Sequence, residues 1–333
     1  MKVGLTYDLR DDYLARGFKE EDVAEFDSRR TIEGLESALN TLGYQTQRIG
    51  HLQALVESLV RGETWDLVFN LAEGWRGFGR EAQIPALLEA YNIPYTFSDP
   101  LTLSLSLHKG MAKRVVRDVG LPTPDFLVVE SADQAMSLTV ELPYPLFVKP
   151  VAEGTGKGIS AASRIDDPGQ LASACLSLLA KYGQPVLVET FLPGREFTVA
   201  VAGTGPEAEV LGTMEVFLQE GAEEGVYSYF KKENCEEVVV YKLAEDEAAG
   251  KSAEVALAAY RALGCRDAGR VDLRLDAEGR PNFMEVNPLA GLHPEHSDLP
   301  IICNLTGLGY LELINRIMRS AVERNGLGRQ RAA

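Results

Sequence analysis

The stretch Pro281–Asn287 reads Pro-Asn-Phe-Met-Glu-Val-Asn, and the short segment Arg270-Val271-Asp272 lies just before it in the chain. The apolar residues of this stretch are typical of a buried strand. Glu285 and Asn287 stand two positions apart, so on a strand both side chains point to one face. The stretch therefore predicts a strand with a buried side and a polar side.

A second strand, Val271–Leu275, precedes this stretch and is joined to it through the turn residues Asp276–Gly279. A hairpin of the two strands can bring Asp272 beside Glu285 and Asn287. Carboxylate and amide oxygens are hard ligands, and Mg²⁺ takes a few of them and completes its shell with phosphate and water. Asp and Asn are also common turn residues, so these three residues by themselves leave both interpretations open.

The composition is that of an acidic globular protein of ordinary hydrophobicity. The chain has 333 residues, of which 45% are hydrophobic and 25% charged, and its net charge is -16. This length allows two or three domains. The negative charge disfavours nucleic acid and anionic membrane surfaces as partners, because both attract positive charge. An anionic nucleotide remains possible, since a single pocket can be basic on an acidic protein.

The four cysteines, Cys175, Cys235, Cys265 and Cys303, are widely spaced and form no Cys-x-x-Cys pair. We therefore expect neither a zinc site nor a disulfide framework, and reduced thiols in the cytoplasm fit best. The N-terminus has no long apolar run of the signal-peptide kind. No stretch approaches the roughly 18 apolar residues of a membrane helix.

Three domains are expected along the chain. Residues 1–100 alternate strands and helices, with a fourth strand at Ile93–Phe97, and this predicts a doubly wound parallel sheet of the α/β class. Residues 101–185 form a small α+β domain with a glycine-rich loop, and residues 186–333 form an α+β domain with an antiparallel sheet. Leu218–Glu237 has little periodicity and is predicted to be a mobile, functional loop.

The loop Glu153–Ser160 reads Glu-Gly-Thr-Gly-Lys-Gly-Ile-Ser. A P-loop requires Gly at Val151 and a hydroxyl residue at Gly158, and a dinucleotide fingerprint requires Gly at Ile159, so both motifs fail. A loop between antiparallel strands that folds over a triphosphate fits, because small residues let backbone N–H groups approach phosphate oxygens. A flexible hairpin turn is the alternative. Lys149, at the end of the preceding strand, favours the phosphate site.

In their order along the chain, these elements resemble the ATP-grasp superfamily and, within it, the D-alanine–D-alanine ligases. The resemblance covers about Val3 to Leu313 and rests on His108-Lys109, Val148-Lys149-Pro150, Glu153–Ser160, Val188-Glu189, Arg195–Val199, Arg270–Asp272 and Glu285–Asn287. It implies the ATP-grasp fold: a doubly wound N-terminal domain, followed by a small central α+β part and a C-terminal antiparallel α+β part that bind ATP.

The resemblance implies a set of residues that bind the phosphates, adenine and ribose of ATP. They are Lys109, Lys149, Glu153, Gly154, Thr155, Gly156, Gly158, Ser160, Glu189, Phe191, Leu192 and Glu196. Within this set, Lys109 and Lys149 would contact the phosphates, Glu189 would lie at the adenine edge, and Glu196 would bind the ribose hydroxyls.

The resemblance also implies the residues of phosphoryl transfer. Two Mg²⁺ ions, for which Mn²⁺ could substitute, would be held by Asp272, Glu285 and Asn287. Arg270 would stabilise the transferring phosphoryl group. In the predicted mobile loop, Lys232 would close over the γ-phosphate, and Tyr229 matches an aromatic residue of the family's loop.

The chain departs from the family in the segments where the family binds its first amino acid. Glu25 is the nearest counterpart of the family glutamate that holds the first amino group, although a solvated acidic face is an equal alternative. Glu73 stands where the family has a histidine.

A second departure follows Asn287, where the loop is longer by one residue. Gly291 and Ser297 are the expected counterparts of the residues that hold the second carboxylate, and we group them with the catalytic residues. His293 and His296 are either surface residues or part of the substrate pocket. With Glu25 and Glu73 they could form a pocket for a cationic or unusual amine.

The sequence therefore predicts an ATP- and Mg²⁺-dependent carboxylate–amine ligase that forms a peptide bond between small amino acids through an acyl phosphate. The resemblance favours D-alanyl-D-alanine, a peptidoglycan precursor, as the product. The alternatives are a ligase of the same mechanism for L-amino acids or another carboxylate and amine, and a nucleotide-binding protein without ligase activity. Expected partners are small-molecule amino acids, and a homodimer is expected from the resemblance alone.

Overall fold

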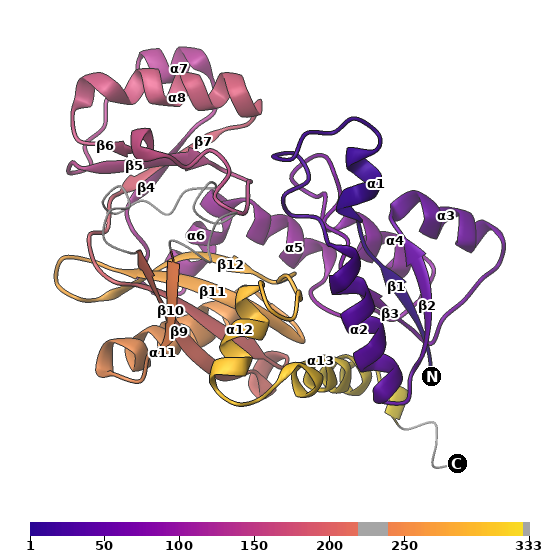
Figure 1. Ribbon diagram of the computed structural model, residues 1–333. Helices are drawn as coiled ribbons and strands as arrows, with labels where there is room; N and C mark the ends of the chain where they lie inside the picture. The colour runs from indigo at the N-terminus through magenta and orange to yellow at the C-terminus, as the bar shows by residue number, and fades with distance from the viewer. Residues whose placement is uncertain (219–238, 329–333) are drawn as a thin grey trace.

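The computed structural model describes residues 1–218 and 239–328, which form parallel and antiparallel sheets covered by helices (Figure 1). Lys232 and Tyr229, with all but the first residue of the predicted mobile loop, lie outside these residues. Within the two described ranges, no helix is long and apolar enough to cross a bilayer.

The N-terminal sheet is parallel, with the strand order β2-β1-β3. Its strands are β1 (Lys2–Thr6), β2 (Gln45–Gly50) and β3 (Leu67–Asn70), and its helices are α1 (Arg10–Leu14), α2 (Arg29–Thr41), α3 (Leu52–Val60) and α4 (Gln83–Ala90). Val3, Leu5 and Phe69 pack in one apolar cluster with α2, whereas Val68 packs in another with α3 and α4. Helices thus cover both faces of the sheet, as expected for a doubly wound arrangement.

The expected fourth strand at Ile93–Phe97 is wrong. This segment makes only an isolated parallel bridge, between Tyr95 and Val68. The backbone of Phe97 adopts a left-handed φ of 69°, and its N–H donates to the carboxylate of Asp267 at 2.7 Å. The segment therefore leaves the extended conformation after the single bridge at Tyr95. The backbone N–H of Phe97 is bound by the side chain of Asp267 instead of by a neighbouring strand.

The central sheet has the order β4-β7-β5-β6 and is antiparallel. Its strands are β4 (Phe126–Val129), β5 (Leu146–Pro150), β6 (Arg164–Ile165) and β7 (Val186–Thr190), and α7 (Ala132–Met136) and α8 (Pro168–Tyr182) pack on it. Strand β7 lies beyond the boundary that we expected at residue 185. Helices α5 (Pro100–Leu107) and α6 (Lys109–Asp118) lie between the lobes (Figure 1).

The C-terminal sheet is antiparallel, with the order β10-β9-β8-β11-β12. Its strands are β8 (Glu196–Ala202), β9 (Glu209–Leu218), β10 (Val239–Leu243), β11 (Ala268–Leu275) and β12 (Pro281–Asn287), and its helices are α11 (Glu247–Ala262), α12 (Asp298–Leu305) and α13 (Tyr310–Arg324). Short 3₁₀ turns occur at Ala161–Ser163 and Gly205–Glu207. Residues of β11 alternate between buried apolar and half-buried polar, because α11 covers one face of the sheet.

A β-bulge in the β11–β12 hairpin separates its core residues from its polar residues. Leu273 pairs with Phe283 and Asp272 pairs with Glu285, so Met284 is the extra residue. Phe283 and Val286 consequently belong to the core cluster under α11, although they are an odd number of positions apart. The sequence pattern had predicted Met284 as a buried residue, but it is only half-buried.

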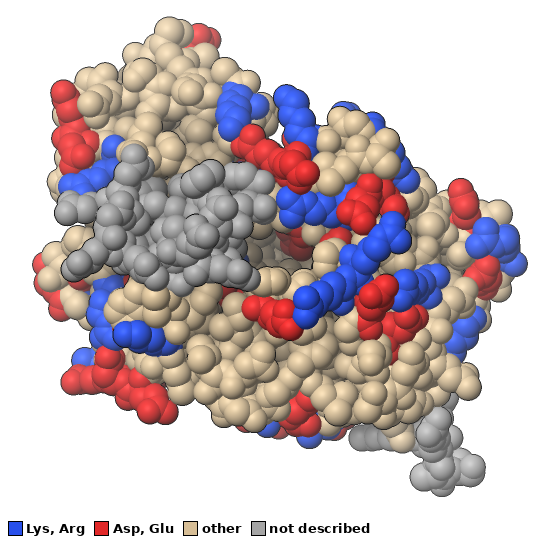
Figure 2. All heavy atoms as spheres, in the orientation of Figure 1, with Lys and Arg blue, Asp and Glu red and all other residues tan. Residues whose placement is uncertain are grey.

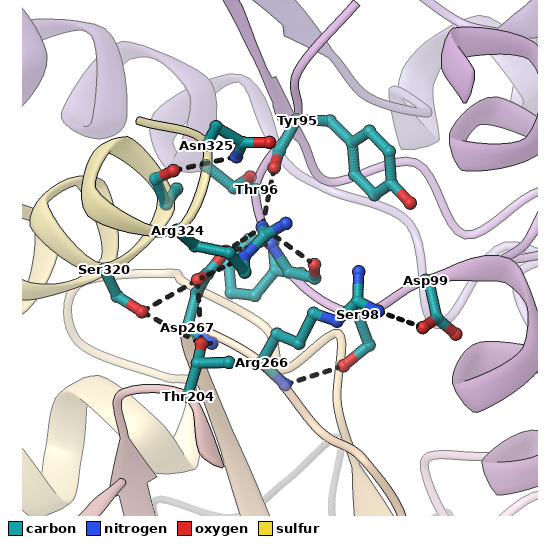
Figure 3. Close-up of polar contacts among 12 residues, drawn as sticks. Tyr95, Thr96, Ser98, Asp99, Thr204, Arg266, Asp267, Ser320, Arg324 and Asn325 are labelled. Atoms are coloured by element: carbon teal, nitrogen blue, oxygen red, sulfur yellow. Dashed lines mark hydrogen bonds and ion pairs between the residues drawn. The ribbon is translucent and has the colours of Figure 1, made fainter. Parts of the chain in front are cut away.

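A buried carboxylate, Asp267, joins three segments that are distant in the sequence (Figure 3). It accepts hydrogen bonds from Arg324 at 2.8 Å and Ser320 at 2.8 Å on α13, and from Thr204 at 3.2 Å after β8. It also binds the backbone N–H of Phe97. The same carboxylate therefore connects the edge of the N-terminal sheet, the C-terminal sheet and the last helix.

Candidate functional site

The half-buried face of the β11–β12 hairpin gathers most of the residues expected at a phosphate-transfer centre. Asp272 pairs with Glu285, and Arg270 pairs with Asn287, so the four side chains share one face of the sheet. Asn287 Nδ2 lies 3.3 Å from Asp272 Oδ2. On the neighbouring strand β8, the hydroxyl of Thr198 donates to Asp272 Oδ1 at 2.9 Å. These contacts place the hairpin's oxygen atoms in one cluster.

Arg270 is a basic residue in contact with the acids of this cluster. Its guanidinium forms an ion pair with Asp272 and lies 3.4 Å from Asp298, the first residue of α12. Burial alone would lower the pKa of Arg270, but Asp272, Asp298 and Glu285 outweigh it and raise the pKa. Arg270 is therefore a permanent cation in the centre of the site.

Lys109 meets the cluster from the first turn of α6. This helix begins at Lys109 because the preceding His108 caps it, with its ring accepting the N–H of Met111 at 3.2 Å. Lys109 Nζ lies 3.3 Å from Glu285 Oε2 and 2.5 Å from the backbone oxygen of Glu153. Burial would raise the pKa of Glu285, but Lys109, Lys149 and Arg270 lower it to about 2. Glu285 is therefore ionised at neutral pH.

The glycine-rich loop follows β5 and closes in two tight turns. The N–H of Lys157 donates to the oxygen of Gly154, and the N–H of Ile159 donates to the oxygen of Gly156, both at 3.0 Å. Gly156 and Gly158 have positive φ angles of 72° and 78°. A Cβ at Gly158 would also lie 2.5 Å from Pro150 Cγ, so the turn requires glycine there.

An ion-pair network fastens this loop to the N-terminal lobe. Lys157 Nζ lies 2.8 Å from Glu153 Oε2 and 2.9 Å from Glu25 Oε2. Arg80 also binds Glu25, at 3.0 Å. Burial would raise the pKa of Glu25, but Arg80 and Lys157 outweigh it and lower the pKa. Glu25 packs so closely on Gly154 that a Cβ at Gly154 would collide with the carboxylate.

A cavity of about 640 Å³ lies between the three lobes, and a second cavity of about 130 Å³ adjoins it. Figure 2 shows a hollow in the middle of this face, with acidic and basic side chains gathered along its rim. The larger cavity is lined by predicted site residues from all three lobes: Glu25, Glu73, Lys109, Glu153, Gly154, Thr155, Arg270, Glu285, Asn287, Gly291, His293, His296 and Ser297. The smaller cavity adds Lys149, Gly156, Glu196 and Asp272.

Five predicted nucleotide-binding residues line neither cavity: Gly158, Ser160, Glu189, Phe191 and Leu192. The carboxylate of Glu189 is fully buried and lies 2.9 Å from Lys113 Nζ and 2.8 Å from Lys149 Nζ. The ring of Phe191 packs behind the smaller cavity, with the guanidinium of Arg274 5.2 Å from its centre. Arg274 also lies 3.5 Å from Glu196.

The loop after β12 forms another wall of the larger cavity. Ser297 Oγ accepts the N–H of His293 at 2.9 Å, and a Cβ at Gly291 would lie 2.8 Å from this hydroxyl. The rings of His293 and His296 lie 4.5 Å apart between centroids. Burial, and then the adjacent His296, lower the pKa of His293. The loop ends where α12 begins, and the first two residues of that helix, Asp298 and Leu299, line the cavity.

Sequence reasoning missed several charged residues of this site: Asp27, Arg80, Glu81, Lys157 and Asp298. One signal was present for the acids, since Asp27 and Glu81 lie in the loops that follow β1 and β3, and ligands bind at the carboxyl ends of parallel strands. No local signal identified Arg80 or Lys157. Their partner Glu25 is 55 and 132 residues away, respectively.

The hairpin has a donor set that fits Mg²⁺. The carboxylates of Asp272 and Glu285 and the amide of Asn287 share one face of the hairpin, and Lys109 lies beside them. Mg²⁺ takes few protein ligands and retains water and phosphate oxygens in its shell. Asp272, Glu285 and Asn287 are the residues that would hold it.

Known proteins were compared with the chain by sequence and by structure. The family model described as the D-ala D-ala ligase C-terminus matches residues 115–319. The D-alanine–D-alanine ligase of Bordetella petrii is 36% identical over 77% of this chain and 76% of that protein. An uncharacterized protein, y4sG of Sinorhizobium fredii, is 34% identical over 89% of this chain and 88% of its own length.

Two solved structures share the fold over nearly the whole chain. The D-alanine–D-alanine ligase of Bacillus anthracis, complexed with ATP, has a TM-score of 0.74 and 21% identity, covering 98% of this chain and 99% of that chain. VanG D-Ala:D-Ser ligase of Enterococcus faecalis has a TM-score of 0.74 and 21% identity, covering 96% and 99%. The fold is therefore ATP-grasp, and the extent of the sequence match shows that the chain belongs to the D-alanine–D-alanine ligase family.

Proposed function

We propose that the protein is an ATP-dependent ligase that joins the carboxylate of one amino acid to the amine of another through an acyl phosphate. The observation that carries this proposal is the meeting of Arg270, Glu285 and Lys109 at the wall that both cavities share, with Asp272 beside them in the smaller cavity and the glycine-rich loop next to it. These are the charges that phosphoryl transfer requires, and the cavity beside them is large enough for substrates.

The proposed reaction has two steps. A carboxylate oxygen of the first amino acid attacks the γ-phosphorus of ATP, the bond to the bridging oxygen breaks, and ADP leaves with that electron pair. The amine of the second amino acid then attacks the acyl carbon, phosphate leaves, and the amine loses a proton. The first step is needed because a free carboxylate has no good leaving group.

The cationic side chains would position and neutralise the phosphates. Lys109 and Lys149 both line the smaller cavity with residues of the glycine-rich loop, and Arg270 contacts both Asp272 and Asp298. Positioned charges of this kind stabilise the charge that spreads over the transferring group. Mg²⁺ held by Asp272, Glu285 and Asn287 would neutralise further phosphate charge.

The start of α12 would receive the carboxylate of the second amino acid. Gly291 and Ser297 lie against each other at the cavity wall, and α12 begins beside them at Asp298. Helix N-termini bind carboxylates because their N–H groups and dipole favour negative charge. The names of the ligase relatives make D-alanine the first amino acid to test in both positions.

The test is a turnover assay with ATP, Mg²⁺ and a panel of D- and L-amino acids, in which phosphate release and product mass are both measured. Release with D-alanine alone, with a product of the dipeptide mass, supports D-alanyl-D-alanine. Release only with another amino acid keeps the ligase and changes its substrate. ATP binding without release with any pair would overturn the ligase in favour of a nucleotide-binding protein.

Glu285→Ala tests the proposed centre directly. Because Glu285 lies in register with Asp272 and is ionised, its removal should lower kcat by at least about 100-fold. Glu278→Ala, in the exposed turn of the same hairpin, is the matched control and should leave kcat within about 2-fold. Substantial activity of Glu285→Ala would contradict the assignment of the hairpin as the metal and phosphate site.

We also propose that Lys232 closes over the γ-phosphate and that Tyr229 is an aromatic residue of the same loop. We further propose that the domains divide near residues 100 and 185 and that the protein is a homodimer. A cytoplasmic location and a role in peptidoglycan synthesis would follow if D-alanyl-D-alanine is the product. Size-exclusion chromatography with light scattering tests the dimer.

A further inference from the structure

Among the described residues, three carboxylates line the larger cavity and have no side-chain partner. They are Asp27, Glu73 and Glu81, and none of them makes a side-chain hydrogen bond or an ion pair with any of the described residues. Glu81 is 8% exposed. Asp27 and Glu73 are half-buried. A carboxylate that is largely withdrawn from water and has no hydrogen-bond donor from the protein is less stable in its charged form than one on the surface.

The basic residues around the same cavity are already bound to other acids. Arg80 and Lys157 bind Glu25, at 3.0 Å and 2.9 Å. Lys109 lies 3.3 Å from Glu285, and Arg270 binds the acids at the hairpin and α12. Arg80 and Lys109 still act on Glu81 from a distance, but within the described residues no basic side chain forms an ion pair with Asp27, Glu73 or Glu81.

The ionisation of these acids reflects this environment. Burial raises the pKa of Glu73, and Glu81 and Glu25 raise it further. Burial likewise raises the pKa of Asp27, with Asp8 adding to the effect. A bound cation would reverse these shifts, because it would stabilise the charged form.

The spacing of the acids favours an organic cation over a metal ion. Among the described residues, no group of three His, Cys, Asp or Glu side chains converges closely enough to hold a metal ion. An ammonium group needs only separate acceptors for its three N–H donors. The acids also line the cavity that contains Arg270, Glu285 and Asn287, so a group bound to them would belong to a molecule at the reaction centre.

We infer that one of the two amino-acid substrates has a cationic, nitrogen-bearing side chain, and that Glu73 and Glu81, with Asp27 beside them, bind that second positive charge. This inference rests on the proposed ligase function and specifies its substrate class. The α-amino group is a separate charge, and it is available to Glu25 or to the acyl carbon. The acids would thus select a diamino acid over an amino acid of the same length without the side-chain charge.

The experiment compares pairs of amino acids that differ only in this charge. Ornithine is matched with norvaline, and lysine with norleucine, each as both enantiomers, alone and together with D-alanine. Phosphate release gives kcat/KM, and calorimetric titration in the presence of a non-hydrolysable ATP analogue gives the dissociation constant. We expect the cationic member of a pair to have a kcat/KM at least about 10-fold higher, the usual size of a charge-assisted contact.

The variants Glu73→Gln and Glu81→Gln localise the effect. Each should lower kcat/KM for the cationic amino acid by about 10-fold or more and leave the neutral partner nearly unchanged. Glu57→Gln, on the exposed side of α3 and outside the cavity, is the matched control. It should leave kcat/KM unchanged for both the cationic and the neutral amino acid. Both cavity variants should fold, because neither removes a side-chain hydrogen bond or an ion pair found among the described residues.

A kcat/KM for the neutral amino acids equal to or higher than that for the cationic ones would overturn the inference. So would a variant that lowers kcat/KM equally for the cationic and the neutral member of a pair. Turnover with D-alanine while no cationic amino acid binds would also overturn it and leave the proposed function intact. Binding of the cationic amino acid without phosphate release under any condition would support the acidic subsite and contradict the ligase.

Discussion

Glu81 shows how a single side chain can make stability depend on pH. It lies buried at the cavity wall, 8% exposed. Burial raises its pKa to about 7, with Arg80 and Lys109 opposing the shift and Glu25 adding to it. The folded protein therefore holds a proton on Glu81 at a pH where the unfolded chain has lost it.

The sign of the effect follows from this difference. Between the ordinary pKa of 4.5 and about 7, the folded state binds more protons than the unfolded state, so stability falls as pH rises through that window. Glu81→Gln removes the ionisable group and therefore this fall in stability with rising pH. We expect the free energy of unfolding of the variant, relative to the wild type, to increase by roughly 1–3 kcal/mol between about pH 5 and about pH 8.

Urea unfolding of both proteins at several pH values measures this difference. Glu57→Gln controls for the loss of one negative charge at an exposed position. A difference between Glu81→Gln and wild type that does not change with pH would show that Glu81 is ionised in the folded protein throughout the range.

Lys113 is a buried basic residue that attaches helix α6 to the neighbouring strands. It lies on α6 and is fully buried, 2.9 Å from Glu189 on β7. Its ammonium also donates to the backbone oxygen of Phe283 on β12 and to the hydroxyl of Thr123, both at 3.1 Å. Burial lowers the pKa of Lys113 to about 8, although Glu189 opposes the shift. One side chain thus joins α6 to strands of two different sheets.

Lys113→Met should destabilise the protein even though Met fills a similar volume. It leaves Glu189 with Lys149 as its remaining ion pair, and it removes one of the two donors to the backbone oxygen of Phe283, the other being the hydroxyl of Thr123. We expect a decrease of roughly 2–4 kcal/mol in the free energy of unfolding, near the range for breaking a buried pair. Arg114→Met, the next residue and exposed on the same helix, should change it by less than about 0.5 kcal/mol.

Urea unfolding followed by circular dichroism is the measurement for both variants. Equal stability of Lys113→Met and wild type would mean that the desolvation of the lysine offsets everything it gains from Glu189 and Phe283.

At the scale of the whole molecule, Asp267 connects the lobes. Figure 3 shows it between Arg324 and Ser320 on one side and Thr204 on the other, next to the segment that contains Tyr95 and Ser98. Arg324 also donates to the backbone oxygen of Tyr95 at 2.9 Å. The junction therefore fixes α13 against both the N-terminal lobe and the C-terminal sheet.

Asp267→Asn tests this junction without changing the backbone, because Asn tolerates the left-handed φ of 64° found there. The new amide would leave Arg324 without its ionic partner. Its N–H groups would also point at groups that donate to Asp267 in the wild type, such as Ser320 and the N–H of Phe97. We expect a loss of about 3–5 kcal/mol in the free energy of unfolding. Thermal and urea unfolding measure it, and Glu207→Gln, exposed near Thr204, is the control. A loss below about 1 kcal/mol would contradict the role of Asp267 as a junction.

The clustering of Asp272, Glu285 and Asn287 in the proposed phosphate-transfer centre was predictable from the sequence because its signals are local. The alternation in β11, the turn at Asp276–Gly279 and the pair Glu285 and Asn287 all lie within a short hairpin. A strand has a side-chain period of two, so such a pattern determines which residues share a face. The bulge at Met284 was not predictable, since it depends on the core that Phe283 joins.

The sequence alone determined the fold class, the hairpin and the glycine-rich loop, because each depends on residues that are close together in the chain. The tertiary structure decided which charges meet. Glu25 binds Lys157 across 132 residues, and Asp27, Glu73 and Glu81 line one cavity, where they have no side-chain partner in the described part of the chain. Electrostatic energy depends on separation in space and on burial, and neither can be read from spacing along the chain. The phosphate-transfer chemistry is therefore visible in the sequence, whereas the charge of the substrate pocket is visible only in the fold.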